Sequence, residues 1–146
     1  MAGTQRMQPV LTTADADGVG IRLFLSGKTR AAALIIGTDA VLSPFAVPDN
    51  EWSHVVWTFN ENTKRITVTV NAKEEVDKAF GQYHGTAVSW LGKLVTSAGN
   101  VYFTGSMDEL VFFDRALNLF EIEVLAGVVP AVSPITNLQF EDSAHL

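Results

Sequence analysis

Hydrophobic and polar residues alternate along much of the chain with the period of two that is typical of half-buried β-strands. Residues 19–25 alternate in this way, and residues 31–36 form a second apolar run. Pro44, Pro48 and the polar residues that follow them interrupt the pattern. The first third of the chain therefore predicts two strands followed by a connecting loop.

The clearest local signal is a β-hairpin in the middle of the chain. Residues 54–59 and 66–70 both alternate, and a short polar run, residues 60–64, joins them. Two alternating segments linked in this way are typical of antiparallel neighbours. We expect the apolar residues of this hairpin to share one interior with a later strand; the residues assigned to that interior are Trp57, Phe59, Val68 and Phe112.

The second half of the chain contains further short strands. The charged residues 74–78 indicate a loop or the edge of a sheet, and residues 88–95 predict a strand that breaks at Gly92. Residues 101–104 and 109–113 predict two more strands on either side of a Gly-Ser turn.

The period changes at Asn118. An Asn followed three residues later by Glu121 has the spacing of a capping box, and Gly127 is a suitable stop signal. The sequence predicts a short helix of two to three turns that covers an open end or edge of a sheet. Residues 128–134, with two prolines, then form a linker, and residues 135–141 alternate again. The apolar stripe of the helix consists of Leu119, Ile122, Val124 and Leu125.

Composition restricts the fold class and the possible partners. The 146 residues fit one domain, and 47% of them are hydrophobic. The 16 acidic and 10 basic side chains give a net charge of -6, which argues against nucleic-acid binding, because phosphate contacts need clustered Lys and Arg. There is no cysteine, no apolar run of membrane-spanning length and no hydrophobic signal core at the N-terminus. Many short strands and one helix predict an all-β protein, an antiparallel β-sandwich of the jelly-roll type.

Two segments resemble motifs of the laminin-G-like, or concanavalin A-like, lectin/glucanase domains. Residues 51–72 read EWSHVVWTFNENTKRITVTVNA and resemble the central hairpin of the family, with Ala72 where the family usually has Gly. Residues 103–127 read FTGSMDELVFFDRALNLFEIEVLAG and resemble its C-terminal signature. The resemblance implies a concanavalin A-like jelly roll over residues 1–129 and a recognition role.

The ends of the chain depart from the family outline. Family members usually begin with a strand that carries an aromatic-acidic motif, and this chain begins near a later segment. Its C-terminal stretch NLQFEDSAHL resembles the missing strand. Residues 130–146 therefore contain a linker and a strand with three open roles. The strand completes its own sheet, adds to a neighbouring subunit to form a homo-oligomer through residues 135–146, or begins a next domain.

The acidic pair at Asp108 and Glu109 is a metal candidate. The resemblance implies that Asp108, joined by Glu141 and Asp142, holds a structural calcium, which needs oxygen ligands. The alternative is that Asp108 accepts hydrogen bonds from backbone amides at a turn and that Glu109 pairs with Arg115.

Aromatic residues are the candidates for ligand contacts, because their flat apolar faces suit the C–H face of a sugar. The candidates are Trp52, Trp57, Tyr83, Trp90 and Tyr102. Trp57 shares a face with the hairpin core, and Trp52 matches a packing position of the family. Tyr83, His84 and Trp90 lie in the irregular stretch GQYHGTAVSW, where a loop position favours ligand binding.

No catalytic motif is evident. Glucanase relatives carry a Glu-x-Asp-x-x-Glu strand motif, which is absent here, and no nucleophile elbow is present. We therefore predict a protein that is not an enzyme. We expect it to be a recognition module that binds carbohydrate or a protein surface through rim loops. The alternative is a structural assembly subunit. In either case we expect an extracellular, cell-surface or virion location, without membrane insertion.

Overall fold

The computed structural model describes residues 6–13, 20–73, 76–81 and 88–128. Within these residues the chain forms ten strands and one helix, and no helix there is long and apolar enough to cross a membrane. The predicted C-terminal strand lies outside the described residues. The elements are β1 Gln8–Thr13, β2 Ile21–Leu25, β3 Ala31–Ile36, β4 Asp39–Ala46, β5 Val55–Asn60, β6 Arg65–Val70, β7 Val76–Ala79, β8 Val88–Leu91, β9 Lys93–Thr96, β10 Gly99–Tyr102 and α1 Leu119–Leu125.

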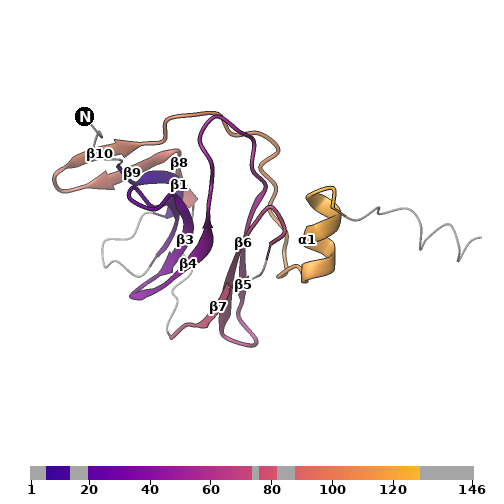
Figure 1. The fold of residues 1–146 in the computed structure, drawn as a ribbon. Coiled ribbons are helices and arrows are strands. Elements are labelled where there is room, and N and C mark those ends of the chain that lie inside the picture. Colours follow the sequence, from indigo (N-terminus) through magenta and orange to yellow (C-terminus); the bar gives the residue numbers. More distant parts are fainter. Residues whose placement is uncertain (1–5, 14–19, 74–75, 82–87, 129–146) are drawn as a thin grey trace, which may run out of the picture.

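The strands form two facing sheets and a separate hairpin (Figure 1). One sheet has the order β4-β3-β2-β1-β8 and the other has the order β5-β6-β7, while β9 and β10 pair with each other. Every pairing among these strands is antiparallel. The predicted fold class, an all-β antiparallel sandwich with one short helix, is thereby confirmed.

The core lies between the two sheets, and the period-two pattern explains its composition. Successive side chains of a strand point to opposite faces, so alternate residues of each strand point towards the other sheet. The Trp57 indole Nε1 also donates a hydrogen bond to the Ala33 carbonyl, 3.0 Å away, which ties β5 to β3. The buried core consists of Leu25, Ala32, Leu34, Ile36, Val41, Ile66, Val68, Val70 and Phe80, with Trp57 and Phe59 packed against it.

The β5–β6 hairpin has the predicted form. Its register pairs Trp57 with Val68 and Phe59 with Ile66, so the apolar residues of both strands share the core face. The polar residues Thr58 and Thr67 also face each other, on the opposite side, and their hydroxyl groups are hydrogen bonded. The hairpin therefore has an apolar face towards the core and a hydroxyl-lined face on the opposite side of the sheet, where Thr58 and Thr67 are also buried.

The predicted loop around Pro44 is wrong, because Pro44 lies within strand β4. β4 is an edge strand of its sheet, and proline is tolerated there since its missing N–H leaves no ladder hydrogen bond unmade. Pro44 is exposed, whereas Val41 and Ser43 are buried. The alternation was present in the sequence, but the two prolines concealed it.

The predicted strand at residues 109–113 is also wrong. Residues 103–118 have no strand or helix assignment, and they cross the end of the sandwich to reach α1 (Figure 1). Phe112, which we expected in the shared interior, is 66% exposed. An alternating pattern makes a strand only when a neighbouring backbone pairs with it, and the described residues supply none here.

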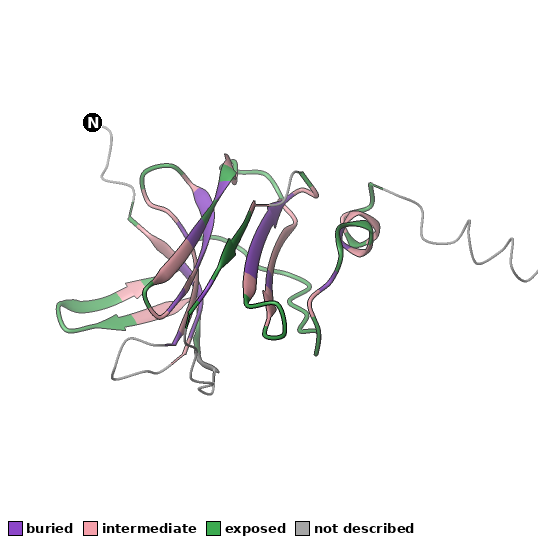
Figure 2. Ribbon diagram, turned by 90° about the horizontal axis from the view of Figure 1, so that it is seen from below, coloured by how far each residue is buried: buried purple, intermediate pink, exposed green. Residues whose placement is uncertain are grey.

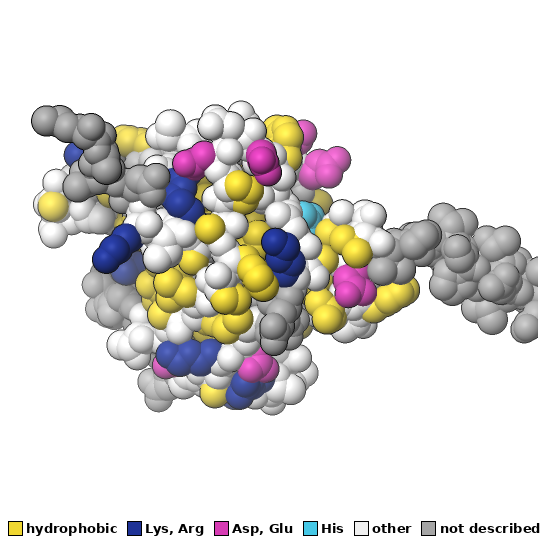
Figure 3. Space-filling model, in the orientation of Figure 1, with side chains coloured by type: hydrophobic (Ala, Val, Ile, Leu, Met, Phe, Trp, Pro, Cys, Tyr) yellow, Lys and Arg dark blue, Asp and Glu magenta, His cyan; other side chains and the backbone are white. Residues whose placement is uncertain are grey.

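Helix α1 begins where the sequence predicts. The Asn118 side chain accepts a hydrogen bond from the Glu121 backbone, and the Glu121 carboxylate accepts one from the Asn118 backbone, which completes the capping box. The helix lies on the side of the β5-β6-β7 sheet that faces away from the five-stranded sheet (Figure 2). Only part of the predicted stripe is covered: Ile122 is fully buried, while Leu119 and Leu125 are exposed. Hydrophobic side chains are accordingly visible over α1 in Figure 3.

Candidate functional site

An exposed aromatic surface lies where β8, β9 and β10 meet. β8 is paired with β1, which places Trp90 opposite Thr12. The chain then turns sharply at Gly92, whose φ of 65° lies in the left-handed region that favours glycine. The β9–β10 register pairs Lys93 with Tyr102. A strand, a left-handed turn and a hairpin thus bring Trp90, Lys93 and Tyr102 together; we call these three residues the aromatic surface.

The side chain of Lys93 lies over both rings. Its ammonium nitrogen is 4.2 Å from the centroid of the Trp90 ring and 5.9 Å from the centroid of the Tyr102 ring. Both distances fall within the range of cation–π attraction. Trp90 nevertheless remains 40% exposed and Tyr102 58% exposed. The Asn100 amide donates a hydrogen bond to the Tyr102 hydroxyl, 3.3 Å away.

Hydrogen bonds hold the backbone beneath this surface in place. The Thr12 hydroxyl donates to the Lys93 carbonyl at 2.8 Å. The Gly92 amide donates to the Val10 carbonyl at 2.8 Å, and its own carbonyl accepts from the Phe103 amide at 2.8 Å. Because Thr12 and Val10 are buried in the five-stranded sheet, the aromatic surface is attached to the rigid part of the fold rather than to a free loop.

The chemistry of this surface suits recognition. Indole and phenol rings offer flat apolar faces with polar edges, which match the alternating C–H and hydroxyl groups of a sugar. Lys93 adds three hydrogen-bond donors and one positive charge, and Asn100 adds an amide. Val95, which is exposed, lies on the same face of β9 as Lys93 and extends the apolar area. The set can stack against a ring and donate hydrogen bonds to its edge.

Two members of this surface, Trp90 and Tyr102, were among the aromatic candidates from the sequence, and the third, Lys93, was missed. Trp90 was predicted as a ligand residue and lies in it, whereas Tyr83 and His84 fall outside the described residues. Lys93 was not predicted, because its place over the Trp90 ring depends on the turn at Gly92. Gly92 was the signal in the sequence that could have indicated this position. A glycine between two strand segments allows the chain to turn, and the turn brings the residues on either side of it together.

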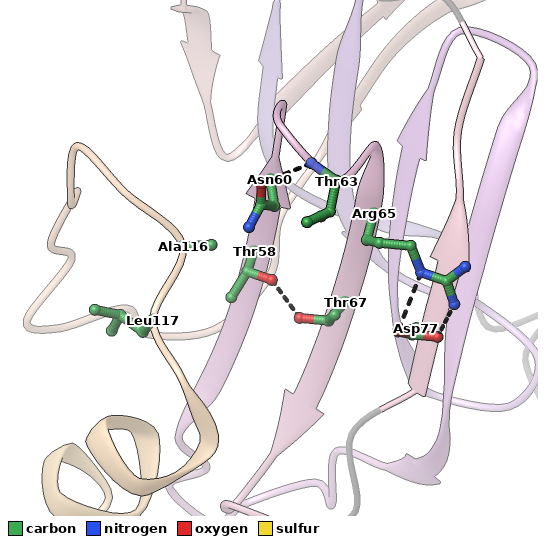
Figure 4. Close-up of a pocket in the computed structure, with 8 residues that line it drawn as sticks. All are labelled: Thr58, Asn60, Thr63, Arg65, Thr67, Asp77, Ala116 and Leu117. Atoms are coloured by element: carbon green, nitrogen blue, oxygen red, sulfur yellow. Dashed lines mark hydrogen bonds and ion pairs between the residues drawn. The ribbon is translucent and has the colours of Figure 1, made fainter.

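A polar pocket of about 200 Å³ lies on the outer face of the β5-β6-β7 sheet (Figure 4). The Arg65 guanidinium and the Asp77 carboxylate form a two-point ion pair there, with an Nε–Oδ2 distance of 3.1 Å. Asp77 is the one carboxylate in this pocket, and Arg65 occupies both of its oxygens. The lining residues are Thr58, Asn60, Thr63, Arg65, Thr67, Asp77, Ala116 and Leu117.

Asp108 makes a hydrogen bond to a backbone amide, as we considered in the alternative to a metal site. The Asp108 carboxylate accepts a hydrogen bond from the Glu109 amide at 2.8 Å, and both side chains are exposed. Across the described ranges, no three His, Asp or Glu side chains are grouped in a way that could hold a metal ion. Glu141 and Asp142 lie outside those ranges.

The alternative to a metal site also predicted that Glu109 pairs with Arg115. Arg115 does not form this pair. Its guanidinium instead holds both oxygens of Glu121, at 2.6 and 2.8 Å. Glu109 acts on His54: burial lowers the pKa of that imidazole, and the Glu109 carboxylate opposes the shift. Glu109 is therefore close to the start of β5.

Comparison with known proteins agrees with the sequence motifs. Residues 2–123 match the family model described as the concanavalin A-like lectin/glucanases superfamily, so the chain belongs to that superfamily. No curated protein matches the chain. A solved structure, residues 221–444 of an S-layer domain-containing protein from Clostridium thermocellum ATCC 27405, is similar with 21% identity and a TM-score of 0.42. The match covers 86% of this chain and 65% of that one.

Proposed function

We propose that this member of the concanavalin A-like lectin/glucanase superfamily is a non-catalytic recognition module that binds carbohydrate through its aromatic surface. The observation that carries the proposal is the pair of exposed rings, Trp90 and Tyr102, both within cation–π distance of the Lys93 ammonium group. Rigid aromatic side chains supply much contact area at little entropic cost. Their attachment to a hydrogen-bonded backbone keeps them in a binding-ready arrangement.

The absence of catalysis is part of the proposal. Hydrolysis of a glycosidic bond uses two carboxyl groups on either side of the bond. The aromatic surface contains no carboxylate, and the pocket described on β5-β6-β7 contains Asp77 alone, paired with Arg65. A carboxylate held at both oxygens by a guanidinium is a poor base and a poor nucleophile. These features support binding rather than bond cleavage.

A glycan array tests this proposal. We expect the wild-type chain to bind at least one glycan class, and Trp90→Ala and Tyr102→Ala each to weaken that binding by about tenfold or more, the usual effect of removing a central aromatic contact. Trp52→Ala is the matched control, since Trp52 is 71% exposed and lies before β5, outside the aromatic surface. Equal losses in all three variants, or no glycan bound by the wild type, would contradict the proposal.

Structural assembly is the second candidate. The supporting observation is the exposed apolar run Leu110, Val111, Phe112 and Phe113, because contiguous apolar area at a surface commonly marks a protein contact. Either function suits an extracellular, cell-surface or virion protein, and we propose such a location. Light scattering over a concentration series tests assembly: self-association that Phe112→Ser abolishes supports it, and a monomer at every concentration excludes it.

A structural calcium remains a proposal as well. Asp108 is exposed, and one of its carboxylate oxygens accepts a hydrogen bond from the Glu109 amide. Glu141 and Asp142 are its proposed partners. Thermal unfolding with calcium and with a chelator tests the idea. If calcium binds the folded state, the melting temperature rises with calcium concentration. Identical melting curves would remove calcium from the account.

A further inference from the structure

The polar pocket on the outer face of the β5-β6-β7 sheet has two unlike walls (Figure 4). One wall consists of hydroxyl, amide and charged side chains from the three strands and from the turn between β5 and β6. The other wall consists of Ala116 and Leu117, in the segment that leads to α1, and the Ala116 methyl group points towards the strands. Convergent polar groups beside an apolar wall are the usual form of a small-molecule site.

The polar wall contains buried hydroxyl groups whose hydrogen-bonding capacity is only partly used. Thr58 and Thr67 are each 7% exposed, and their hydroxyl groups share one hydrogen bond. That bond uses one of the two hydroxyl protons, and the residues that the structure describes supply no acceptor for the other. Because buried polar groups normally have partners, this pair favours a pocket occupant that accepts a hydrogen bond.

Two neighbouring side chains add further donors. The Asn60 side-chain oxygen accepts a hydrogen bond from the Thr63 amide at 3.1 Å, which orients the side chain, and the Asn60 NH2 group has no partner among the described residues. Arg65 binds Asp77 through its Nε and Nη2 atoms. The hydrogens on Arg65 Nη1 are therefore available to a ligand as well.

The charge balance of the pocket favours a neutral ligand. Among the lining residues, all of which the structure describes, Arg65 is the one cation and Asp77 the one anion, and they neutralise each other. An anionic ligand would be repelled by Asp77 without a second cation to offset the repulsion. Hydroxyl groups both donate and accept hydrogen bonds, so a neutral polyol matches a lining of hydroxyl, amide and paired ionic groups.

The size of the pocket restricts the ligand further. Its volume is about 200 Å³, which is below the ~300–1,000 Å³ that is typical of pockets for drug-sized ligands. A single sugar ring suits this volume better than an oligosaccharide does. The C–H groups of such a ring would make van der Waals contacts with Ala116 and Leu117.

We propose that this pocket is a second ligand site, which binds one neutral sugar residue. The hydroxyl groups of the ring accept hydrogen bonds from the Thr58–Thr67 pair, from the Asn60 amide and from Arg65, and the C–H groups face Ala116. The pocket lies on the side of the molecule that carries α1, whereas the aromatic surface lies on β8, β9 and β10 at the other side (Figure 1). Neither proposal therefore rests on the other.

An NMR titration of the isotope-labelled full-length chain tests the pocket. The probes are glucose, galactose, mannose, xylose and N-acetylglucosamine, with acetate and inorganic phosphate as anionic probes. We expect at least one sugar to shift the Asn60 side-chain amide signals and the Thr67 backbone amide signal in a saturable way. A Kd of roughly 1 mM is expected, because the pocket offers a few neutral hydrogen bonds and no aromatic ring. Acetate and phosphate should leave these signals unchanged.

Two variants and a matched control assign the binding to the pocket. Ala116→Leu fills the cavity without removing a hydrogen bond and should abolish the shifts. Thr67→Val keeps the shape of the side chain, removes one hydroxyl group and should weaken binding about fivefold, the usual effect of one neutral hydrogen bond. The control is Thr29→Val, an exposed threonine in the turn between β2 and β3, which should bind as the wild type does.

Three results would overturn the proposal. The first is a titration in which no sugar of the panel shifts the pocket signals, which would leave water as the occupant. The second is a response to acetate or phosphate without a response to any sugar. The third is an equal loss of affinity in Thr67→Val and Thr29→Val.

The two proposed sites fail separately. Trp90→Ala and Tyr102→Ala, which test the aromatic surface on the glycan array, should leave the pocket titration unchanged. A pocket that binds none of the probes would leave the glycan-array result in place, because the array variants do not touch the residues that line the pocket.

Discussion

Replacing Ile66 by Ala tests whether the two sheets share one core. Ile66 belongs to the core cluster and is fully buried. Its partner across the β5–β6 hairpin is Phe59. The substitution removes three carbon atoms, which at ~0.8 kcal/mol each amounts to ~2.4 kcal/mol of lost transfer free energy. The cavity left behind adds to this loss, so we expect the free energy of unfolding to fall by about 3 kcal/mol.

The loss is measured by urea unfolding and by calorimetry. A domain of this size loses roughly 2–4 °C in melting temperature for each kcal/mol, so the expected shift is about 6–12 °C. Ile66→Val should cost about 0.5–1.5 kcal/mol. Val95→Ala is the control on an exposed position and should change stability by less than about 0.5 kcal/mol. A loss below about 1 kcal/mol for Ile66→Ala would refute a core shared by both sheets.

Three further predictions concern the helix and the turn below the aromatic surface. Asn118→Ala removes the N-cap of α1 and should cost about 1 kcal/mol, measured by urea unfolding. Arg115 lowers the pKa of Glu121 from 4.5 to about 2; because the folded value lies below the unfolded one, this contribution to stability is present above pH 4.5 and disappears as the pH falls towards 2. An NMR titration of the Glu121 carboxylate checks the pKa, and a value near 4.5 would contradict the pairing. Gly92→Ala forces a positive φ on a residue with a Cβ and should cost about 1–2 kcal/mol; an unchanged melting temperature would mean that the turn is not left-handed.

The sequence was sufficient for the parts of the fold that are determined locally. The β5–β6 hairpin follows from two alternating segments and a polar turn, and each of these signals lies within a few residues. The capping box at Asn118 and Glu121 is equally local. In both places short-range pattern and tertiary packing agree, so the prediction and the structure coincide.

Other features depend on partners that are distant in the sequence. Pro44 is tolerated in β4 because β4 lies at the edge of its sheet. Which strand lies at the edge depends on the arrangement of the whole sheet. Residues 109–113 have the pattern of a strand but no pairing backbone in the described structure. The position of Lys93 over Trp90 needs both the turn at Gly92 and the pairing of β8 with β1. The periodicity within one segment gives no information on the edge position of β4, on a pairing partner for residues 109–113 or on the position of Lys93.

The most direct test of the carbohydrate-binding surface uses the indole signals of the protein, since the chain contains three tryptophans. In an NMR titration with a glycan that binds on the array, we expect the Trp90 indole N–H signal to shift progressively with ligand concentration. The Trp57 indole, which is hydrogen bonded to Ala33 in the core, and the exposed Trp52 indole should stay unchanged. A titration that shifts Trp52 while the Trp90 signal remains fixed would contradict the assignment of the aromatic surface as the binding site.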